Sequence, residues 1–403
     1  MKIAIIQMSD LHITTDKDFI VQESKTLARA IASKINSCNK VVVVVTGDII
    51  DKGNVSNYEH AKTMFKNFEE EIKKEAQLES WDYVIVPGNH DLDFSKKYDF
   101  RDIVLEKCLS TNKIDNEAHA NELLKPQSKF WEFYSELSND RIDPKISFKK
   151  IIAFNDNSHL EFHCYNTALL SIVNEKPQSL IVPEASFIDY KDDHPGQQDI
   201  VISVFHHKQS WLSTSGKLNN QRAFIDHIEK SSQIIMCGHE HQRDSKMLMD
   251  VVNKDRVLYL ESDSLQQGNV QSFSLLILSD SERGNVSKCD IILDSKEKEW
   301  KFSDEIVLKI PYHNHKISFS ESYSKDLDSI SAPIHHPRKN DLILDDIYVY
   351  PDLDPQSNKS DDKIMLYLDS KDILDSISSF MLESCFTSIY LLKLFICIFP
   401  IFE

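Results

Sequence analysis

Short runs of consecutive apolar residues recur along the first 280 positions of the chain. The clearest run is Val41–Val45, which consists of five valines. It is too short for a helix and entirely β-branched, so it predicts a strand that is buried on both faces. Similar runs predict strands elsewhere. They are Ile3–Met8, Tyr83–Val86, Phe162–Val173, Ile200–Phe205, Ile234–Cys237, Val257–Glu261 and Phe273–Leu278.

Amphipathic segments lie between these apolar runs. Apolar residues at helical spacing over Phe19–Ile35 predict one helix, with Asp16 or Asp18 as its N-cap. A second apolar stripe covers Tyr58–Ile72, and a third covers Phe224–Ile228. Strands that alternate with helices in this way are typical of an α/β domain.

The character of the chain changes after about residue 280. We expect a first domain over residues 1–280, an accessory region over 281–337, and an acidic linker with an apolar C-terminal segment over 338–403. Cys385–Phe402 approaches the roughly 18 apolar residues of a membrane-spanning helix, but Lys393 lies in its middle. A membrane anchor, a buried terminal element and the start of a truncated, fused or adjacent C-terminal domain stay open, and no firm membrane partner is predicted.

Composition and charge narrow the classes of function. The 403 residues carry a formal charge of −18. This argues against broad binding to nucleic acid, which needs a basic surface, so nucleic acid is a possible partner but not the favoured one. The seven cysteines are scattered and form no Cys-x-x-Cys pair, so neither a disulfide framework nor a zinc knuckle is indicated. A reducing, cytoplasmic location fits this pattern best.

Five short polar motifs each follow one of the predicted strands. In chain order they are Asp10-Leu11-His12, Gly47-Asp48, Gly88-Asn89-His90-Asp91, His206-His207 and Gly238-His239-Glu240-His241. Loops at the carboxyl ends of strands converge on the ligand site of an α/β sheet, so these side chains are expected to meet. In the two motifs with a His at i+2, both side chains are expected on one side of an extended segment, because strand side chains alternate.

The residue types in these motifs suit divalent metals. Carboxylate, imidazole and amide-oxygen ligands fit Mn, Fe, Zn or Ni better than calcium. A lone aspartate such as Asp48 can bridge two metals, because each carboxylate oxygen has lone pairs to offer. Two cations about 4 Å apart can activate water and stabilise charge on a phosphoryl group. We therefore expect two divalent metal ions, with manganese the first choice.

The ordered set D-x-H, GD, GNHD, H and GHxH resembles the calcineurin-like metallophosphoesterase superfamily over about residues 1–280. Gly47–Ala61 further resembles the branch that contains cyclic-nucleotide and glycerophosphodiester phosphodiesterases. The resemblance implies a four-layer α/β/β/α sandwich of two mixed β-sheets flanked by helices. It also implies the metal ligands. One metal would be held by Asp10, His12, Asp48 and His241, and the other by Asp48, Asn89, His206 and His239.

The resemblance implies a mechanism as well. A hydroxide activated by the two metals would attack phosphorus, and His90 would protonate the leaving oxygen or stabilise its charge. Asp91 would orient the His90 ring, and His207 would contact the substrate or lie behind the ligands. We expect a phosphodiesterase or phosphomonoesterase that acts on a small phosphorylated or nucleotide substrate. Two alternatives stay open, a nuclease of the same superfamily and the phosphoesterase module of a multidomain signalling or defence protein.

Overall fold

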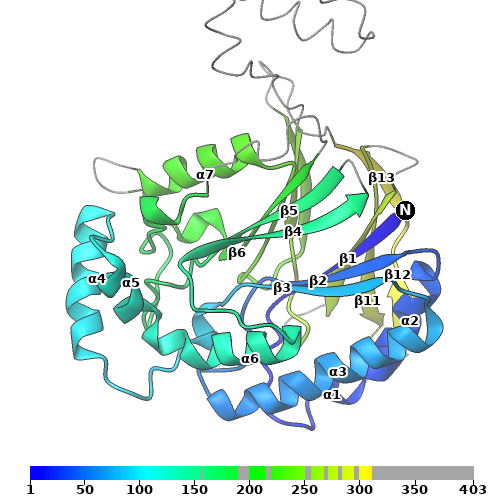
Figure 1. Cartoon of the computed structure of the whole chain (residues 1–403), viewed down its shortest axis with the longest axis horizontal. Coiled ribbons are helices and arrows are strands. Elements are labelled where there is room, and N and C mark those ends of the chain that lie inside the picture. The colour runs from blue at the N-terminus through cyan, green and yellow to red at the C-terminus, as the bar shows by residue number, and fades with distance from the viewer. Residues whose placement is uncertain are drawn as a thin grey trace, which may run out of the picture. The chain divides into compact units, whose positions relative to one another are not determined.

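Two β-sheets pack face to face in the computed structural model of the chain (Figure 1). Helices cover their outer faces, which confirms the predicted α/β/β/α sandwich of two mixed sheets. The structure describes residues 1–310 except 156–157, 189–198, 215–218, 250–255, 267–270, 280–283 and 295–298. All of the described residues belong to one compact unit, Met1–His315.

The first sheet has the strand order β12-β11-β10-β1-β2-β3, and β13 pairs with β11. β1, β2 and β3 run parallel, and β10 is antiparallel to β1. The strands are β1 (Lys2–Met8), β2 (Lys40–Val45), β3 (Ser80–Ile85), β10 (Ser272–Ser279), β11 (Asn285–Asp294), β12 (Glu299–Phe302) and β13 (Ile306–Lys309).

The second sheet has the strand order β4-β5-β6-β7-β9-β8. β5, β6, β7 and β9 run parallel, and the two edge strands β4 and β8 are antiparallel to their neighbours. The strands are β4 (Ser147–Asn155), β5 (Ser158–Tyr165), β6 (Ile200–His207), β7 (Ile234–Gly238), β8 (Asp244–Met249) and β9 (Arg256–Glu261).

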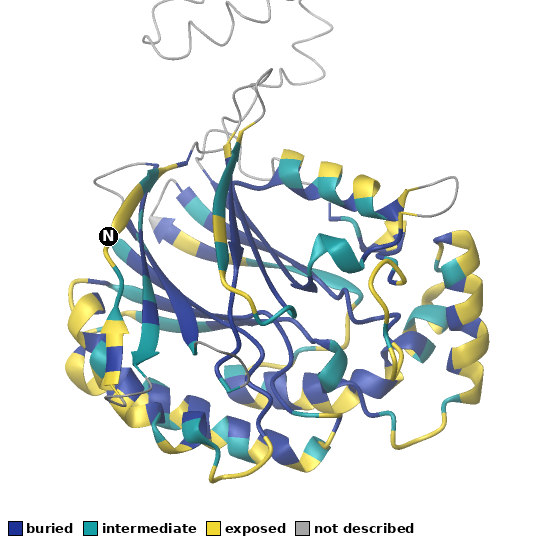
Figure 2. Ribbon diagram, turned by 180° about the vertical axis from the view of Figure 1, so that it is seen from behind, coloured by how far each residue is buried: buried dark blue, intermediate teal, exposed yellow. Residues whose placement is uncertain are grey.

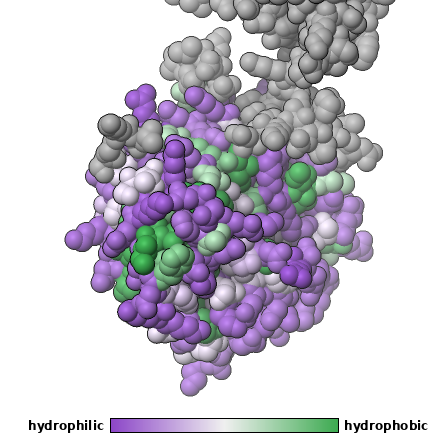
Figure 3. Space-filling view, turned by 60° about the vertical axis from the view of Figure 1, so that its left-hand side comes forward, coloured by the Kyte–Doolittle hydropathy of each residue, from purple (hydrophilic) through white to green (hydrophobic). Residues whose placement is uncertain are grey.

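The valines of β2 show how the sequence builds the layers. Val42 and Val44 pack between the two sheets, whereas Val41, Val43 and Val45 pack under the helices on the outer face. The strand is therefore buried on both faces, as its unbroken apolar run predicts, and the strands are the most buried part of the fold in Figure 2. The face of the molecule in Figure 3 is mainly hydrophilic, because most large apolar side chains are used in these cores.

The helices divide between the two outer faces. α1 (Phe19–Gln22), α2 (Ser24–Ile35), α3 (Tyr58–Glu75) and α6 (Ser128–Ser138) cover the first sheet, and α7 (Asn220–Ser231) covers the second. α4 (Asp99–Thr111) and α5 (Glu117–Leu124) pack with Leu169 and Leu170 in a separate apolar cluster. The helical stripes predicted at Tyr58–Ile72 and Phe224–Ile228 are therefore confirmed.

Two predicted elements are wrong in extent. The single helix expected over Phe19–Ile35 is broken at Glu23, next to Ser24, whose hydroxyl donates to the Val21 carbonyl. Such side-chain bonds to the backbone commonly bend helices. The strand expected over Phe162–Val173 ends at Tyr165, because the apolar residues after it pack against α4 and α5 instead of continuing the ladder.

The first sheet continues past the boundary that we predicted at residue 280. β11 pairs with β10, and β12 and β13 pair with β11, so residues up to Lys309 belong to this sheet. The linker predicted over 338–403 and the apolar segment Cys385–Phe402 lie outside the described residues. Within the described part, the helices are too short or too polar to span a bilayer. The described cysteines all carry free thiols.

Candidate metal centre

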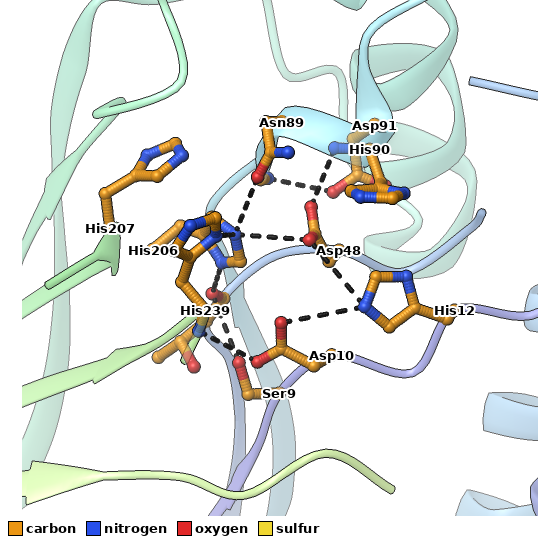
Figure 4. Close-up of polar contacts among 12 residues, drawn as sticks. Ser9, Asp10, His12, Asp48, Asn89, His90, Asp91, His206, His207 and His239 are labelled. Carbon is orange, nitrogen blue, oxygen red and sulfur yellow. Dashed lines mark hydrogen bonds and ion pairs between the residues drawn. The ribbon is translucent and has the colours of Figure 1, made fainter. Parts of the chain in front are cut away.

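The five polar motifs come together between the two sheets, at the carboxyl ends of β1, β2, β3, β6 and β7 (Figure 4). Backbone contacts join the loops directly. The Asp10 N–H donates to the Gly47 carbonyl at 3.1 Å, and the His239 N–H donates to Asp10 Oδ2 at 3.0 Å. The predicted convergence therefore occurs, and it joins residues from both ends of the domain.

The backbone around the site has an unexpected conformation. Five predicted ligands have positive φ in the left-handed region. They are Asp10 at 52°, His12 at 42°, Asp48 at 55°, His239 at 79° and His241 at 50°. The extended Asp-x-His and His-x-His segments that we predicted are therefore wrong. Non-glycine residues seldom adopt this conformation, and such residues cluster at functional sites where the surrounding structure holds them.

Two glycines let the loops approach one another. A Cβ on Gly88 would lie 2.1 Å from Asp48 Oδ1, and a Cβ on Gly47 would lie 2.6 Å from His206 Nδ1. Gly47 also has a φ of 96°, which side chains disfavour. The GD and GNHD motifs therefore need their glycines so that Asp48 and His206 can reach the centre.

One group of ligand atoms gathers around the Asp10 carboxylate. Its Oδ1 lies 3.2 Å from His241 Nε2 and 3.8 Å from His12 Nε2, and the two imidazole nitrogens are 3.2 Å apart. Asp10 is fully buried, and its Oδ1 accepts no hydrogen bond from the described residues. A carboxylate oxygen and two imidazole nitrogens at these separations form a cradle for a cation.

A second group gathers around His206. Its Nε2 lies 3.2 Å from Asn89 Oδ1 and 3.0 Å from His239 Nδ1. Its other nitrogen, Nδ1, lies 2.7 Å from the Thr46 carbonyl oxygen. A carbonyl oxygen only accepts, so Nδ1 carries a hydrogen, and a cation that displaces the proton of Nε2 would meet its lone pair in the centre.

Asp48 lies between the two groups. Its Oδ2 is 3.8 Å from His12 Nε2 on one side and 3.3 Å from His206 Nε2 on the other. Its Oδ1 accepts the backbone N–H of His90 at 2.8 Å, which fixes the carboxylate in this orientation. This is the placement that a ligand shared by two metals requires.

The charges of the centre fit cations. Burial alone would raise the pKa of Asp48, but the charge and hydrogen bond of His206 hold that pKa well below its usual range. Burial would conversely lower the pKa of His206, but the Asp48 carboxylate raises it to about 10. Among the described residues, neither Asp10 nor Asp48 pairs with a lysine or arginine. Two buried carboxylates with only imidazole neighbours are the setting that divalent cations balance.

Comparison with known proteins identifies the family. The calcineurin-like phosphoesterase model matches residues 3–243, which contain all five motifs. The chain belongs to the calcineurin-like phosphoesterase family. The match ends just after the GHEH motif, so the strands that complete the two sheets lie beyond it.

The chain has relatives among curated proteins. It is 24% identical over 254 residues to the metallophosphoesterase-like protein YydB of Bacillus subtilis, a match that covers 60% of this chain and 49% of that protein. It is 29% identical over 91 residues to a probable cyclic nucleotide phosphodiesterase of Vesicomyosocius okutanii, covering 23% of this chain and 34% of that protein. The chain thus spans at most about half the length of these relatives.

Among solved structures, a dimetal phosphatase from Danio rerio is similar, with a TM-score of 0.38 and 11% sequence identity. That match covers 76% of this chain and 98% of the other.

The carboxylate beside His90 is that of Asp51. His90 Nδ1 lies 3.1 Å from Asp51 Oδ1, and the His90 ring stands edge-on to the His12 ring with centroids 4.6 Å apart. The sequence analysis missed Asp51. Its signal is the second aspartate of GDIID, three residues after Asp48.

Asp91 does not orient His90, and that prediction is wrong. The Asp91 carboxylate is buried and accepts the N–H of Gly88 at 2.9 Å, the N–H of Ile49 at 3.1 Å and the Tyr58 hydroxyl at 3.1 Å. Burial, and then the charge of Asp48, raises the pKa of Asp91 to about 7. The 3₁₀ turn η2 (Asn89–Asp91) directs the Asp91 side chain away from the His90 ring. The Asp91 carboxylate instead links the loops of the second and third motifs.

Asp91→Ala is therefore expected to destabilise the fold. The change leaves three buried donors without their acceptor, so we expect a loss of about 3 kcal/mol or more in unfolding free energy. Urea unfolding of the metal-free chain measures it without a contribution from metal binding. Asp51→Ala, whose carboxylate is partly exposed, is the control and should cost less than about 1 kcal/mol. Equal stability of the two variants would contradict this account.

His207 lies behind the ligands. Its side chain is fully buried, with Nε2 3.1 Å from Glu175 Oε2 and Nδ1 3.0 Å from Thr167 Oγ1. Both ring nitrogens are therefore used within the protein. Of the two positions that we predicted for His207, this placement fits the one behind the ligands rather than the substrate contact. Glu175 and Thr167 are neighbours of the site that the sequence did not suggest.

Proposed function

We propose that this chain is a binuclear metallophosphoesterase that hydrolyses phosphodiester or phosphomonoester bonds. The observation that carries the proposal is the position of Asp48 Oδ2, between imidazole nitrogens of His12 and His206 that come from opposite sheets. Family membership supports phosphoric ester hydrolysis. The geometry around Asp48 supports two metals that share this carboxylate.

The ligand groups divide as the resemblance implies. Asp10, His12 and His241 would hold one cation, and Asn89, His206 and His239 the other, with Asp48 common to both. When bound, such a pair supplies an activated water and stabilises negative charge on the phosphoryl group. The carboxylate and amide oxygens suit manganese, our first choice, and the imidazoles also suit iron, zinc or nickel.

His90 is the proposed proton donor to the leaving oxygen. Its side chain is 29% exposed, so it can reach a substrate, unlike the buried His12 and His206. Asp51 Oδ1, 3.1 Å from Nδ1, orients the ring, and an acid needs a fixed orientation toward the leaving oxygen. The loop after the second motif thereby supplies both the shared ligand Asp48 and the partner of the acid.

The proposed substrate is a small phosphorylated molecule or nucleotide. One relative is named a probable cyclic nucleotide phosphodiesterase, and the match includes only 23% of this chain. The formal charge of −18 weighs against an extended nucleic-acid substrate. A fused or adjacent C-terminal domain, and with it a signalling or defence role, remains a prediction for residues outside the described part.

Metal removal is expected to abolish activity. The full chain would be stripped with EDTA, dialysed and supplied with MnCl₂, then assayed on bis(4-nitrophenyl) phosphate, 4-nitrophenyl phosphate, cyclic nucleotides and single-stranded DNA. We expect no turnover by the stripped chain and restored hydrolysis of at least one small ester with Mn²⁺. Full activity of the stripped chain would contradict the proposal. Hydrolysis of DNA alone would favour the nuclease alternative.

A further inference from the structure

His239 differs from its neighbour His206 in how its ring is held. The His206 ring is anchored from behind by the Thr46 carbonyl. The ring of His239 makes one hydrogen-bonding contact among the described residues, between its Nδ1 and His206 Nε2 inside the centre. Its backbone is in the left-handed region, with φ at 79°. Something other than a polar group behind the ring must therefore set the orientation of this ligand.

Two aromatic rings flank the His239 imidazole. The Trp211 ring stands nearly perpendicular to it, at 87°, with centroids 4.2 Å apart. The His207 ring is tilted by 55°, with centroids 4.6 Å apart. The Trp211 contact is edge-to-face and therefore directional, because the positive edge of one ring meets the negative face of the other. The pair forms a slot that allows the imidazole few orientations.

A carboxylate anchors each wall of this slot. Trp211 Nε1 donates to Glu240 Oε1 at 3.3 Å, and His207 Nε2 lies 3.1 Å from Glu175 Oε2. Glu240 also accepts the Ser210 hydroxyl at 2.8 Å and Lys208 Nζ at 3.1 Å. Glu240 thus links residues 208–211 to the loop that carries His239.

We propose that Trp211 and Glu240 are positioning residues for His239, given the metal centre proposed above. Glu240, between the two histidines of GHEH, fixes Trp211, and the Trp211 ring then holds the imidazole with Nδ1 toward His206. His207, fixed by Glu175, closes the other side. The two anchored rings thus orient the His239 imidazole, just as the Thr46 carbonyl orients the His206 imidazole.

The contacts of Lys208 favour a positioning role for this segment over direct phosphate binding. Lys208 Nζ lies 2.7 Å from Glu261 Oε2 and 3.1 Å from Glu240 Oε2, and Glu261 is buried. The ammonium is therefore committed to holding the segment in place.

The test is a calorimetric titration of the metal-free full chain with MnCl₂, comparing wild type with Trp211→Ala, Trp211→Phe, Glu240→Ala and Glu240→Gln. Loss of a group that orients a metal ligand typically weakens metal binding about 10–100-fold. We expect Trp211→Ala to weaken one of the two binding events about tenfold or more and to leave the other unchanged. Glu240→Ala should act in the same direction to a smaller extent. Trp211→Phe keeps a ring and Glu240→Gln keeps an acceptor for Nε1, so both should bind nearly as wild type does.

Trp81→Ala is the matched control. Trp81 is an aromatic residue of β3 that packs on Phe68 and Tyr83, near the amino end of that strand and away from the motifs. Its loss should lower thermal stability without changing either Mn²⁺ affinity. If Trp211→Ala fails to fold by circular dichroism, Glu240→Ala decides the matter.

The outcomes separate this role from the proposed function. Wild type that binds two Mn²⁺ ions, with Trp211→Ala and Glu240→Ala binding them equally well, would overturn the positioning role alone. Wild type that binds no Mn²⁺ would overturn the metal centre itself. A changed KM with unchanged metal affinity in Trp211→Ala would show that the ring contacts substrate, which also overturns the positioning role.

Discussion

The Asp48→Asn variant is expected to bind at most one metal tightly. Its kcat/KM should be lower than that of the wild type by about 10³-fold or more. Loss of a group that only supports a ligand typically weakens metal binding 10–100-fold, and Asp48 is placed to bind both cations itself. The amide keeps an oxygen that can accept the His90 N–H, so the loop should keep its shape. It removes the charge and replaces Oδ2, the oxygen that faces both imidazoles, with an amide NH₂. Calorimetric titration with MnCl₂ and steady-state kinetics on 4-nitrophenyl esters measure the two effects.

Asp199→Asn is the matched control for this change. Asp199 is also buried and also lies beside a histidine, with Oδ1 3.3 Å from His159 Nδ1. It precedes β6, whereas His206 lies near the other end of that strand. We expect Mn²⁺ affinity and kcat to change less than about twofold. A fully active Asp48→Asn variant with two bound metals would contradict the assignment of the shared ligand.

His90→Ala is expected to keep both metals and lose turnover. General acid catalysis contributes about 10²–10⁴-fold, so kcat should fall by that amount on substrates with poor leaving groups. The loss should be much smaller for 4-nitrophenol, which leaves as a stable anion without a proton. Metal affinity should stay near the wild-type value, because His90 contributes its backbone N–H to Asp48 and alanine retains it. Kinetics on alkyl and nitrophenyl esters of the same phosphate give the comparison.

The Asp51→Asn variant tests whether His90 acts as a general acid or only shapes the substrate pocket. Loss of the carboxylate beside His90 Nδ1 should reduce turnover on poor leaving groups in the same pattern as His90→Ala, though less strongly. Combining both changes should give little further loss, since Asp51 acts through the ring. An equal loss on good and poor leaving groups would exclude the acid role for His90.

The α/β class and many of its strands and helices could be predicted because local pattern and tertiary structure agree, whereas the four layers were implied by the family resemblance. The valines of β2 are buried on both faces, as an unbroken β-branched run requires, and the stripe of α3 packs on the outer face of the first sheet. The convergence of the five motifs could be predicted because each lies at or just after the carboxyl end of a strand. The order of the strands and the path beyond residue 280 depend on long-range pairing, which periodicity does not encode.

The errors have physical causes that a sequence does not display. Adjacency in GNHD suggested that Asp91 supports His90, but a 3₁₀ turn points the two side chains in different directions and Asp51 arrives from another loop. The left-handed backbone at Asp10 and His12 is held by N–H bonds to Gly47 and Asp48, so it depends on a neighbouring strand rather than on local preference.

Anomalous diffraction at the manganese edge, from crystals of the full chain grown with MnCl₂, tests the centre most directly. We predict two peaks about 4 Å apart, one on each side of Asp48 Oδ2. One peak would lie beside Asp10 and His241, and the other beside Asn89 and His206. A single peak away from Asp48, or no peak between the sheets, would contradict the account.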